Sequence, residues 1–87
     1  MDWNSTKNKL PEELQTAFDE DGEIDIEKLY LGIFFTLDEY EEVDDEGKHF
    51  EEADNMDIVY YYGNNKWKDN RWNKIYVTHW IEIPPLK

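Results

Sequence analysis

The chain contains one long run of alternating apolar residues, KLYLGIFFTL, at positions 28–37. In an extended chain, successive side chains point to opposite sides. One side of this run carries Leu29, Leu31, Ile33, Phe35 and Leu37, and the other carries Tyr30, Phe34 and Thr36. Because both sides are largely apolar, the pattern predicts a central β-strand that is covered on both faces.

Three further segments predict strands that complete a sheet. Residues 57–62 (DIVYYY) are β-branched and aromatic, which is typical of strands. Residues 63–65 (GNN) signal a turn, after which an extended piece resumes at 66–68. Residues 74–83 (KIYVTHWIEI) alternate again and are followed by two prolines, which end a strand.

The N-terminal region predicts one short helix. Pro11 suits a first helical position, Glu12 and Glu13 suit a helix N-terminus, and Gly22 is a stop signal. The expected fold is therefore α+β: a small antiparallel β-sheet of three to five strands, with one short N-terminal helix at about 11–19. The alternation predicts a core that contains Leu31, Ile33, Phe35, Val59, Val77 and Ile81.

The length of 87 residues indicates a single domain, 1–87. Its most biased part is an acidic insertion at about 38–56. The formal net charge is −13, from 22 acidic and 9 basic residues. Residues 10–57 hold 19 acidic residues and two lysines, whereas residues 58–87 carry a net charge of +3. The chain is thus strongly acidic for two thirds of its length and mildly basic and aromatic at its end.

This charge argues against a protein that binds nucleic acid regardless of sequence or docks on anionic lipid, since both need lysine and arginine. Aromatic residues do alternate with Lys66, Lys68 and Arg71, as they do in proteins that bind single strands. We expect instead that Trp67, Trp72 and Trp80 serve the fold and do not stack nucleotides. No direct contact with nucleic acid and no membrane contact are expected.

Catalytic and metal-binding patterns are weak. The chain has no cysteine, which excludes disulfides, thiolate zinc sites and cysteine nucleophiles. Residues 17–28 resemble a calcium loop faintly, but Ala17 and Lys28 occupy the positions of essential carboxylates. His79 lies on an apolar strand face and is expected to be structural, and His49 lies among carboxylates. We therefore expect no enzyme activity, no cofactor and no metal. No apolar run reaches the roughly 20 residues of a membrane helix, so an intracellular, soluble protein is expected.

The acidic region suggests mimicry of DNA. A compact chain of this length is on the order of 30 Å across, and duplex DNA of that length carries roughly 18 phosphates. The net charge of −17 at residues 10–57 is of the same magnitude. The residues expected to contact a partner are Asp38, Glu39, Glu41, Glu42, Asp44, Asp45, Glu46, Glu51, Glu52 and Asp54. Alternatively, the acidic residues only keep an aromatic-rich chain soluble, or the insertion is a disordered loop.

Three segments carry a family resemblance. They are the ending YVTHWIEIPPL at 76–86, the opening with Trp3 and KLPEE at 9–13, and YYYGNNKW at 60–67. Together they resemble the phage and prophage family catalogued as domain of unknown function 551. The chain departs from that pattern between about 14 and 56, where its acidic stretch is longer. Trp3, Thr78, His79 and Trp80 match the pattern and are expected to be structural.

The resemblance implies a small accessory phage protein and supplies no catalytic residues. Combined with the charge, it leads us to expect a non-catalytic inhibitor of a host defence nuclease, of the anti-CRISPR or anti-restriction type. The expected partner is a basic host protein that handles nucleic acid, in the cytoplasm of the bacterial host. The alternative is an accessory protein–protein interaction module in which the acidity serves only solubility.

Overall fold

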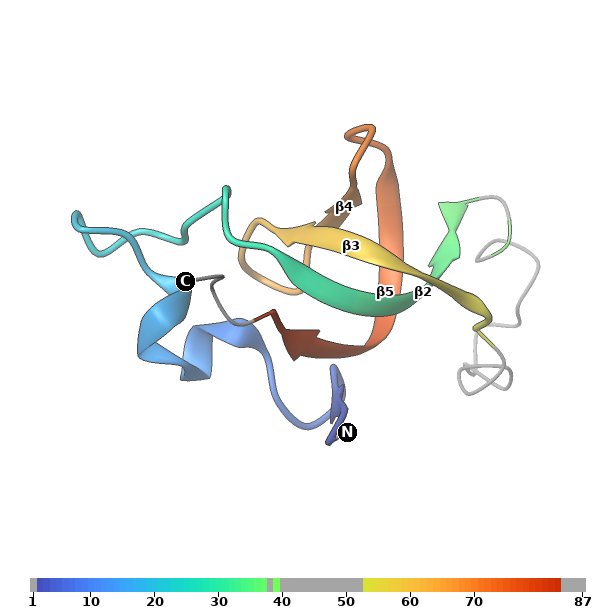
Figure 1. Ribbon diagram of the computed structural model, residues 1–87, viewed down its shortest axis with the longest axis horizontal. Helices are drawn as coiled ribbons and strands as arrows, with labels where there is room; N and C mark the ends of the chain where they lie inside the picture. Colours follow the sequence, from blue (N-terminus) through green and yellow to red (C-terminus); the bar gives the residue numbers. More distant parts are fainter. Residues whose placement is uncertain (1, 38, 40–52, 84–87) are drawn as a thin grey trace.

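The computed structural model describes residues 2–37, 39 and 53–83. It contains one antiparallel sheet of five strands in the order β1-β5-β2-β3-β4, and β4 pairs with β5 as well. The strands are β1 (Asn4–Ser5), β2 (Tyr30–Thr36), β3 (Asn55–Tyr61), β4 (Trp67–Asp69) and β5 (Lys74–Glu82). The pairing of β4 with β5 closes the strands β2 to β5 into a four-stranded barrel, which Figure 1 shows with β1 at its edge.

Strand β5 closes the barrel because it is long enough to use both of its edges. One edge pairs with β2 over nearly its full length. The other edge pairs first with β4, at Lys74 and Ile75, and then with β1, at His79 and Trp80. The short strand β1 therefore takes the part of β5 that β4 leaves unpaired.

The prediction of an α+β fold was wrong, because the chain is nearly all β. The expected helix at 11–19 is replaced by two 3₁₀ turns, η1 (Pro11–Glu13) and η2 (Gln15–Ala17). Leu14 lies between them in an extended conformation, with φ −105° and ψ 132°. No helix of seven or more residues occurs in the described part of the chain.

Tertiary contacts explain why this segment does not form an α-helix. Leu10, Leu14 and Ile24 pack against the barrel core, which an extended Leu14 permits. Phe18, which would have shared a helical face with Leu14, is instead largely exposed. A segment this short nucleates an α-helix poorly, so the gain from packing decides its conformation.

A β-bulge in β5 sets which residues face the barrel interior. Ile33 pairs with His79 and the next residue, Phe34, pairs with Val77, so Thr78 is an extra residue on β5. Thr78 is buried, and its hydroxyl donates a hydrogen bond to the carbonyl oxygen of Ile33 (3.1 Å). A bulge shifts the alternation of the strand by one position. Val77 and Trp80 therefore both face inward although they are three residues apart.

The core prediction was right for β3 and for the first half of β5, and wrong for most of β2. The buried core cluster consists of Tyr30, Phe34, Val59, Tyr61, Trp67, Ile75, Val77 and Trp80. Val59 and Val77 belong to it as expected. Leu31, Ile33 and Ile81 are only half-buried and lie on the outer face of the sheet, and Phe35 is buried but outside the core cluster.

Gly32 explains why β2 turns its other side inward. It pairs with Trp80, and a Cβ atom on Gly32 would lie 2.8 Å from a methyl carbon of Val59. The missing side chain leaves room for Val59 and Val77. The Trp80 ring meets the Tyr30 ring edge-on, with centroids 5.5 Å apart. Trp67 completes the cluster against Tyr61, with ring centroids 4.6 Å apart.

We predict that Gly32→Ala destabilises the barrel by about 1–3 kcal/mol, because the added methyl group overpacks Val59. Urea unfolding of Gly32→Ala, Val59→Ala and the double variant measures this cost and its cause. The double variant should be more stable than the sum of the two single effects, since Val59→Ala removes the clash. Additive effects would contradict the assigned contact.

Candidate functional site

The carboxylates of the described chain fall into two groups. In the first group the carboxylate accepts a hydrogen bond or forms an ion pair within the fold. Its members are Glu12, Asp19, Asp25, Glu39, Asp57, Asp69 and Glu82. In the second group the carboxylate is exposed and has no such partner among the described residues. Its members are Asp2, Glu13, Glu20, Asp21, Glu23, Glu27 and Asp54.

Glu12 shows what the first group does. Its carboxylate accepts hydrogen bonds from the Tyr61 hydroxyl and from the Asn64 backbone N–H (2.7 Å). Tyr61 in turn accepts a hydrogen bond from the Asn65 N–H (2.9 Å). Asn64 and Asn65 have φ values of 54° and 58°, the left-handed conformation that a tight hairpin turn needs. Glu12 thus ties η1 to the β3–β4 turn.

The residues predicted to contact a partner lie mostly outside the described residues. Asp38, Glu41, Glu42, Asp44, Asp45, Glu46, Glu51 and Glu52 cannot be placed for this reason. Asp54 is described and exposed.

Glu39 belongs to the fold rather than to a free surface. Its carboxylate accepts hydrogen bonds from the Thr36 N–H (3.0 Å) and from the Asn55 side chain (2.7 Å), and the Glu39 N–H donates to the Thr36 hydroxyl. These hydrogen bonds, from Thr36 first and then Asn55, hold the pKa of Glu39 below its ordinary value. The reciprocal pair of Thr36 and Glu39 is a capping box.

The structure adds a set of free carboxylates that the sequence pattern alone did not single out. Glu20, Asp21, Glu23 and Glu27, here called the acidic loop, lie between η2 and β2. Local hydrogen bonds fix the conformation of this loop. The Asp19 carboxylate accepts hydrogen bonds from the N–H groups of Asp21 (2.9 Å) and Glu23 (3.0 Å). The sequence contained one indication of this set of free carboxylates, since no lysine or arginine occurs between Glu12 and Glu27.

The acidic loop and the insertion leave the sheet at opposite ends of β2. The loop precedes Tyr30, whereas Glu39 and Asp54 lie beyond Thr36 and next to Asn55, where β3 begins. Figure 1 shows the two ends well apart along the longest dimension of the molecule, which is 39 Å. The acidic loop thus lies at one end of β2, and Glu39 and Asp54 lie at the other.

An aromatic cluster lies on the outside of β3 and β4. Trp72 stacks on Tyr60 with ring centroids 5.3 Å apart and meets Tyr62 edge-on at 5.6 Å, and the Lys68 ammonium lies 5.0 Å from the centre of the Tyr62 ring. Trp67 and Trp80 are buried in the core, as expected, but Trp72 is 53% exposed. Trp72 also has a φ of 67°, which is unfavourable for a bulky residue. The turn holds it there through a hydrogen bond from the Trp72 N–H to the Asp69 carbonyl oxygen (3.1 Å).

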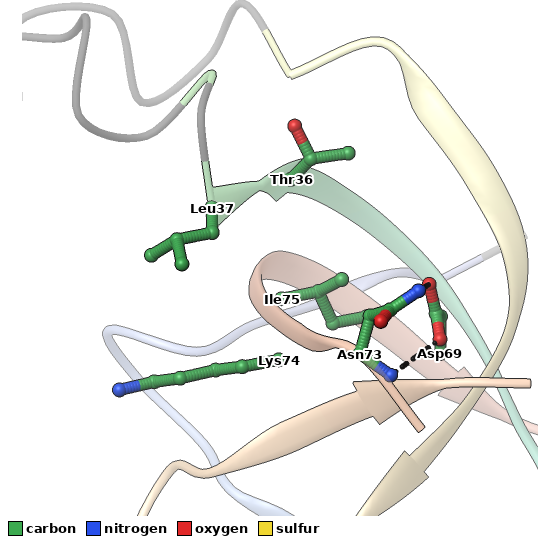
Figure 2. A pocket seen from close by; sticks show the side chains of 6 residues that line it. All are labelled: Thr36, Leu37, Asp69, Asn73, Lys74 and Ile75. Carbon is green, nitrogen blue, oxygen red and sulfur yellow. Dashed lines mark hydrogen bonds between the residues drawn. The ribbon is translucent and has the colours of Figure 1, made fainter. Parts of the chain in front are cut away.

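One shallow depression of about 270 Å³ lies where the end of β2 meets the β4–β5 turn. It is lined by Thr36, Leu37, Asp69, Asn73, Lys74 and Ile75, which Figure 2 shows. The Asp69 carboxylate is already used by the turn, since it accepts hydrogen bonds from the N–H groups of Arg71 and Asn73 and from the Asn73 side chain. The lining therefore offers no nucleophile with a base beside it.

Among the described residues, no group of three or more His, Asp or Glu side chains is placed to hold a metal ion. No helix in that part of the chain has the length and apolar character that crossing a bilayer requires. No family model, no curated protein and no solved structure matches the chain. The resemblance to the phage family therefore stays a prediction. Within it, the V-T-H-W segment corresponds to the bulge of β5.

Burial makes the fold sensitive to alkaline pH. Burial, with Glu82 and Asp25 adding to it, raises the pKa of Tyr30 to about 12, and burial also raises the pKa of Tyr61, with the hydrogen bond to Glu12 adding to it. A raised folded-state pKa gives stability that is fully present below the ordinary value of 10 and is lost as the pH rises through the folded-state value.

We predict that the free energy of unfolding declines from about pH 10 to about pH 12, and that the decline is shallower in Tyr30→Phe, which cannot ionise. Urea unfolding at several pH values measures both slopes. Absorbance at alkaline pH should show that Tyr30 and Tyr61 ionise later than a fully exposed tyrosine. Equal slopes in the two proteins would contradict the burial argument.

Proposed function

We propose that this protein is a non-catalytic binding protein of phage type that inhibits a host defence nuclease through its acidic surface. The observation that carries the proposal is the second group of carboxylates, because these side chains are exposed and no described hydrogen bond or ion pair neutralises them. The only ion pair among the described residues joins Lys28 to Glu82, so it shields none of them. The partner would be a basic protein that handles nucleic acid in the bacterial cytoplasm.

The dimensions support competition with DNA. The molecule is 39 Å long, and duplex DNA of that length carries about 23 phosphates, one per ~1.7 Å. The chain carries 22 acidic residues. Two charged ends separated by β2 would meet a DNA-binding channel at two places along its length. An enzyme whose channel is lined with lysine and arginine would be attracted to such a surface and blocked by it.

We predict that reversal of the acidic loop (Glu20→Lys, Asp21→Lys, Glu23→Lys and Glu27→Lys together) weakens inhibition of the target nuclease by at least about tenfold, while each single reversal has a mild effect. None of these four side chains forms a described hydrogen bond, so the barrel should stay folded. Inhibition should weaken as salt rises from about 0.1 M to about 1 M, because the Debye length shrinks from about 10 Å to about 3 Å.

The assay is DNA cleavage by restriction and CRISPR nucleases at several salt and DNA concentrations. Inhibition by mimicry should be relieved by added duplex DNA. The matched control reverses Lys66, Lys68, Arg71 and Lys74 to glutamate, which should not relieve inhibition. In the insertion, Asp38, Glu41 and Glu42 can be reversed, but Glu39 has to be kept because Thr36 and Asn55 depend on it. Inhibition that changes neither with salt concentration nor on charge reversal would exclude the electrostatic mechanism.

A second candidate function is an accessory protein–protein interaction module whose acidity serves only solubility. Trp72 favours it, because a half-exposed tryptophan held at positive φ stores strain that the fold alone does not require. Exposed tryptophan and tyrosine are typical anchors of protein interfaces. Lys68 lies over the Tyr62 ring of this cluster. Lys66, Lys68, Arg71 and Lys74 are close to it in sequence and form no ion pair with a described residue.

We predict that Trp72→Gly changes the free energy of unfolding by less than about 1 kcal/mol, because relief of the positive φ offsets the lost ring contacts with Tyr60 and Tyr62. Thermal and urea unfolding measure this effect. If the module function holds, the same variant loses its partner, whereas the acidic-loop reversal keeps it. A loss of several kcal/mol would show that Trp72 serves the fold.

A further inference from the structure

The outer face of the sheet is apolar where β3, β2 and β5 lie side by side. Two rows of paired residues cross it: Ile58, Leu31 and Ile81 form one row, and Met56, Ile33 and His79 form the other. Paired residues in an antiparallel sheet point to the same side. The partners on the inner side include Gly32 and Trp80, so these six residues, here called the outer face, point away from the core.

The outer face is accessible. Met56 is 60% exposed, and the other five side chains are half-buried. Leu29 and Leu37 lie on the same side at the two ends of β2 and are 39% and 42% exposed, whereas Phe35, which also lies on that side, is buried. In Figure 1, no described helix or strand lies in front of β2 and β3. The alternating apolar run at 28–37 was predicted to supply core residues. One side of this run instead forms part of the protein surface.

This surface lacks charge in a highly charged protein. Of all residues in the chain, 36% are Asp, Glu, Lys or Arg, yet none of the six outer-face residues is. Sheets with one solvated face normally place polar residues on that face. Exposed apolar patches that are rimmed by polar residues mark sites of protein interaction.

Carboxylates rim this face at both ends of β2. Glu27 and the rest of the acidic loop lie before Leu29, and Asp54 lies directly before β3, beside the far end of β2. An occupant that complements this pattern is apolar along its middle and carries lysine or arginine at both ends. The seven residues of β2 span about 23 Å at ~3.3 Å per residue, which matches about 15 residues of helix at 1.5 Å per residue.

We propose that the outer face binds a basic amphipathic helix of the partner protein, laid along β2 with its apolar side on Ile33, Met56 and Ile58 and its charged ends on the acidic loop and on Asp54. This inference rests on the proposed function and specifies its partner: the carboxylates attract the basic protein, and the outer face holds one of its helices. Two copies of this chain do not complement each other here, because each brings the same carboxylate rim to the contact.

The probe is a synthetic helical peptide of about 18 residues with leucines along one face and lysines at both ends. Its control has the same composition, with the leucines scattered around the helix. The matched peptide should bind at least about tenfold more tightly than the control peptide, which corresponds to about 1.4 kcal/mol. Met56→Gln and Ile33→Thr, which keep the net charge, should remove most of that preference. Ile26→Thr is the matched control variant, because Ile26 is 46% exposed but lies in the acidic loop.

The outcomes separate this inference from the proposed function. Equal binding of both peptides, or an equal loss in Ile26→Thr and Met56→Gln, would overturn the helix site even if nuclease inhibition is observed. A preference for the matched peptide that Met56→Gln abolishes would support the site even if no nuclease is inhibited. Sedimentation of the chain alone tests the remaining occupant: a dimer that Met56→Gln dissociates would show that the outer face binds a second copy and would also overturn the proposal. Far-UV circular dichroism confirms that each variant is folded.

Discussion

The hydrogen bond from the Thr78 hydroxyl to the carbonyl oxygen of Ile33 fixes a bulge on which the rest of the barrel depends. With Thr78 as an extra residue, Val77 and Trp80 both face inward, and Val59 and Val77 occupy the space that Gly32 leaves open. Backbone carbonyl oxygens at the bulge also accept hydrogen bonds from Thr6. The Thr6 hydroxyl donates to the carbonyl oxygen of Val77 (2.9 Å), and the Thr6 N–H donates to that of Thr78 (2.9 Å). These hydrogen bonds hold the N-terminal strand β1 against β5.

The positions of the strands could be predicted from the sequence, but their inner and outer faces could not. Period-two alternation and turn residues located β2 to β5 to within a few residues. In β2 both sides are apolar, so alternation alone does not select the buried side. Gly32 was the useful signal, because a glycine inside a strand often marks a close approach of another chain segment. In β5 the bulge exchanges the inward-facing and outward-facing positions midway along the strand. The local alternation of apolar residues gives no sign of this extra residue. The two-residue strand β1 is too short to leave a periodic pattern.

Composition could predict an acidic surface but not which carboxylates are free to form it. Whether a carboxylate is free depends on partners that are distant in sequence. Glu12 is occupied by Tyr61 and Asn64, about fifty residues away, and only the fold brings them together. Glu39 is different, since the spacing of Thr36 and Glu39 is a local capping signature that was readable in the sequence. For the acidic loop, the sequence showed the negative charge. It did not show that hydrogen bonds within a turn hold the loop in one conformation.

Charge and apolar surface act together in this molecule. An uncovered apolar sheet face favours self-association, because copies can bury it against one another. A net charge of −13 opposes this, since every copy repels every other copy at the distances where apolar contact begins. The repulsion becomes attraction for a partner of opposite charge. In the proposed complex, the same carboxylates would select which proteins can reach the outer face of β2 and β3. Electrostatics then acts mainly on encounter and choice of partner, whereas the buried apolar contact sets how long the complex lasts.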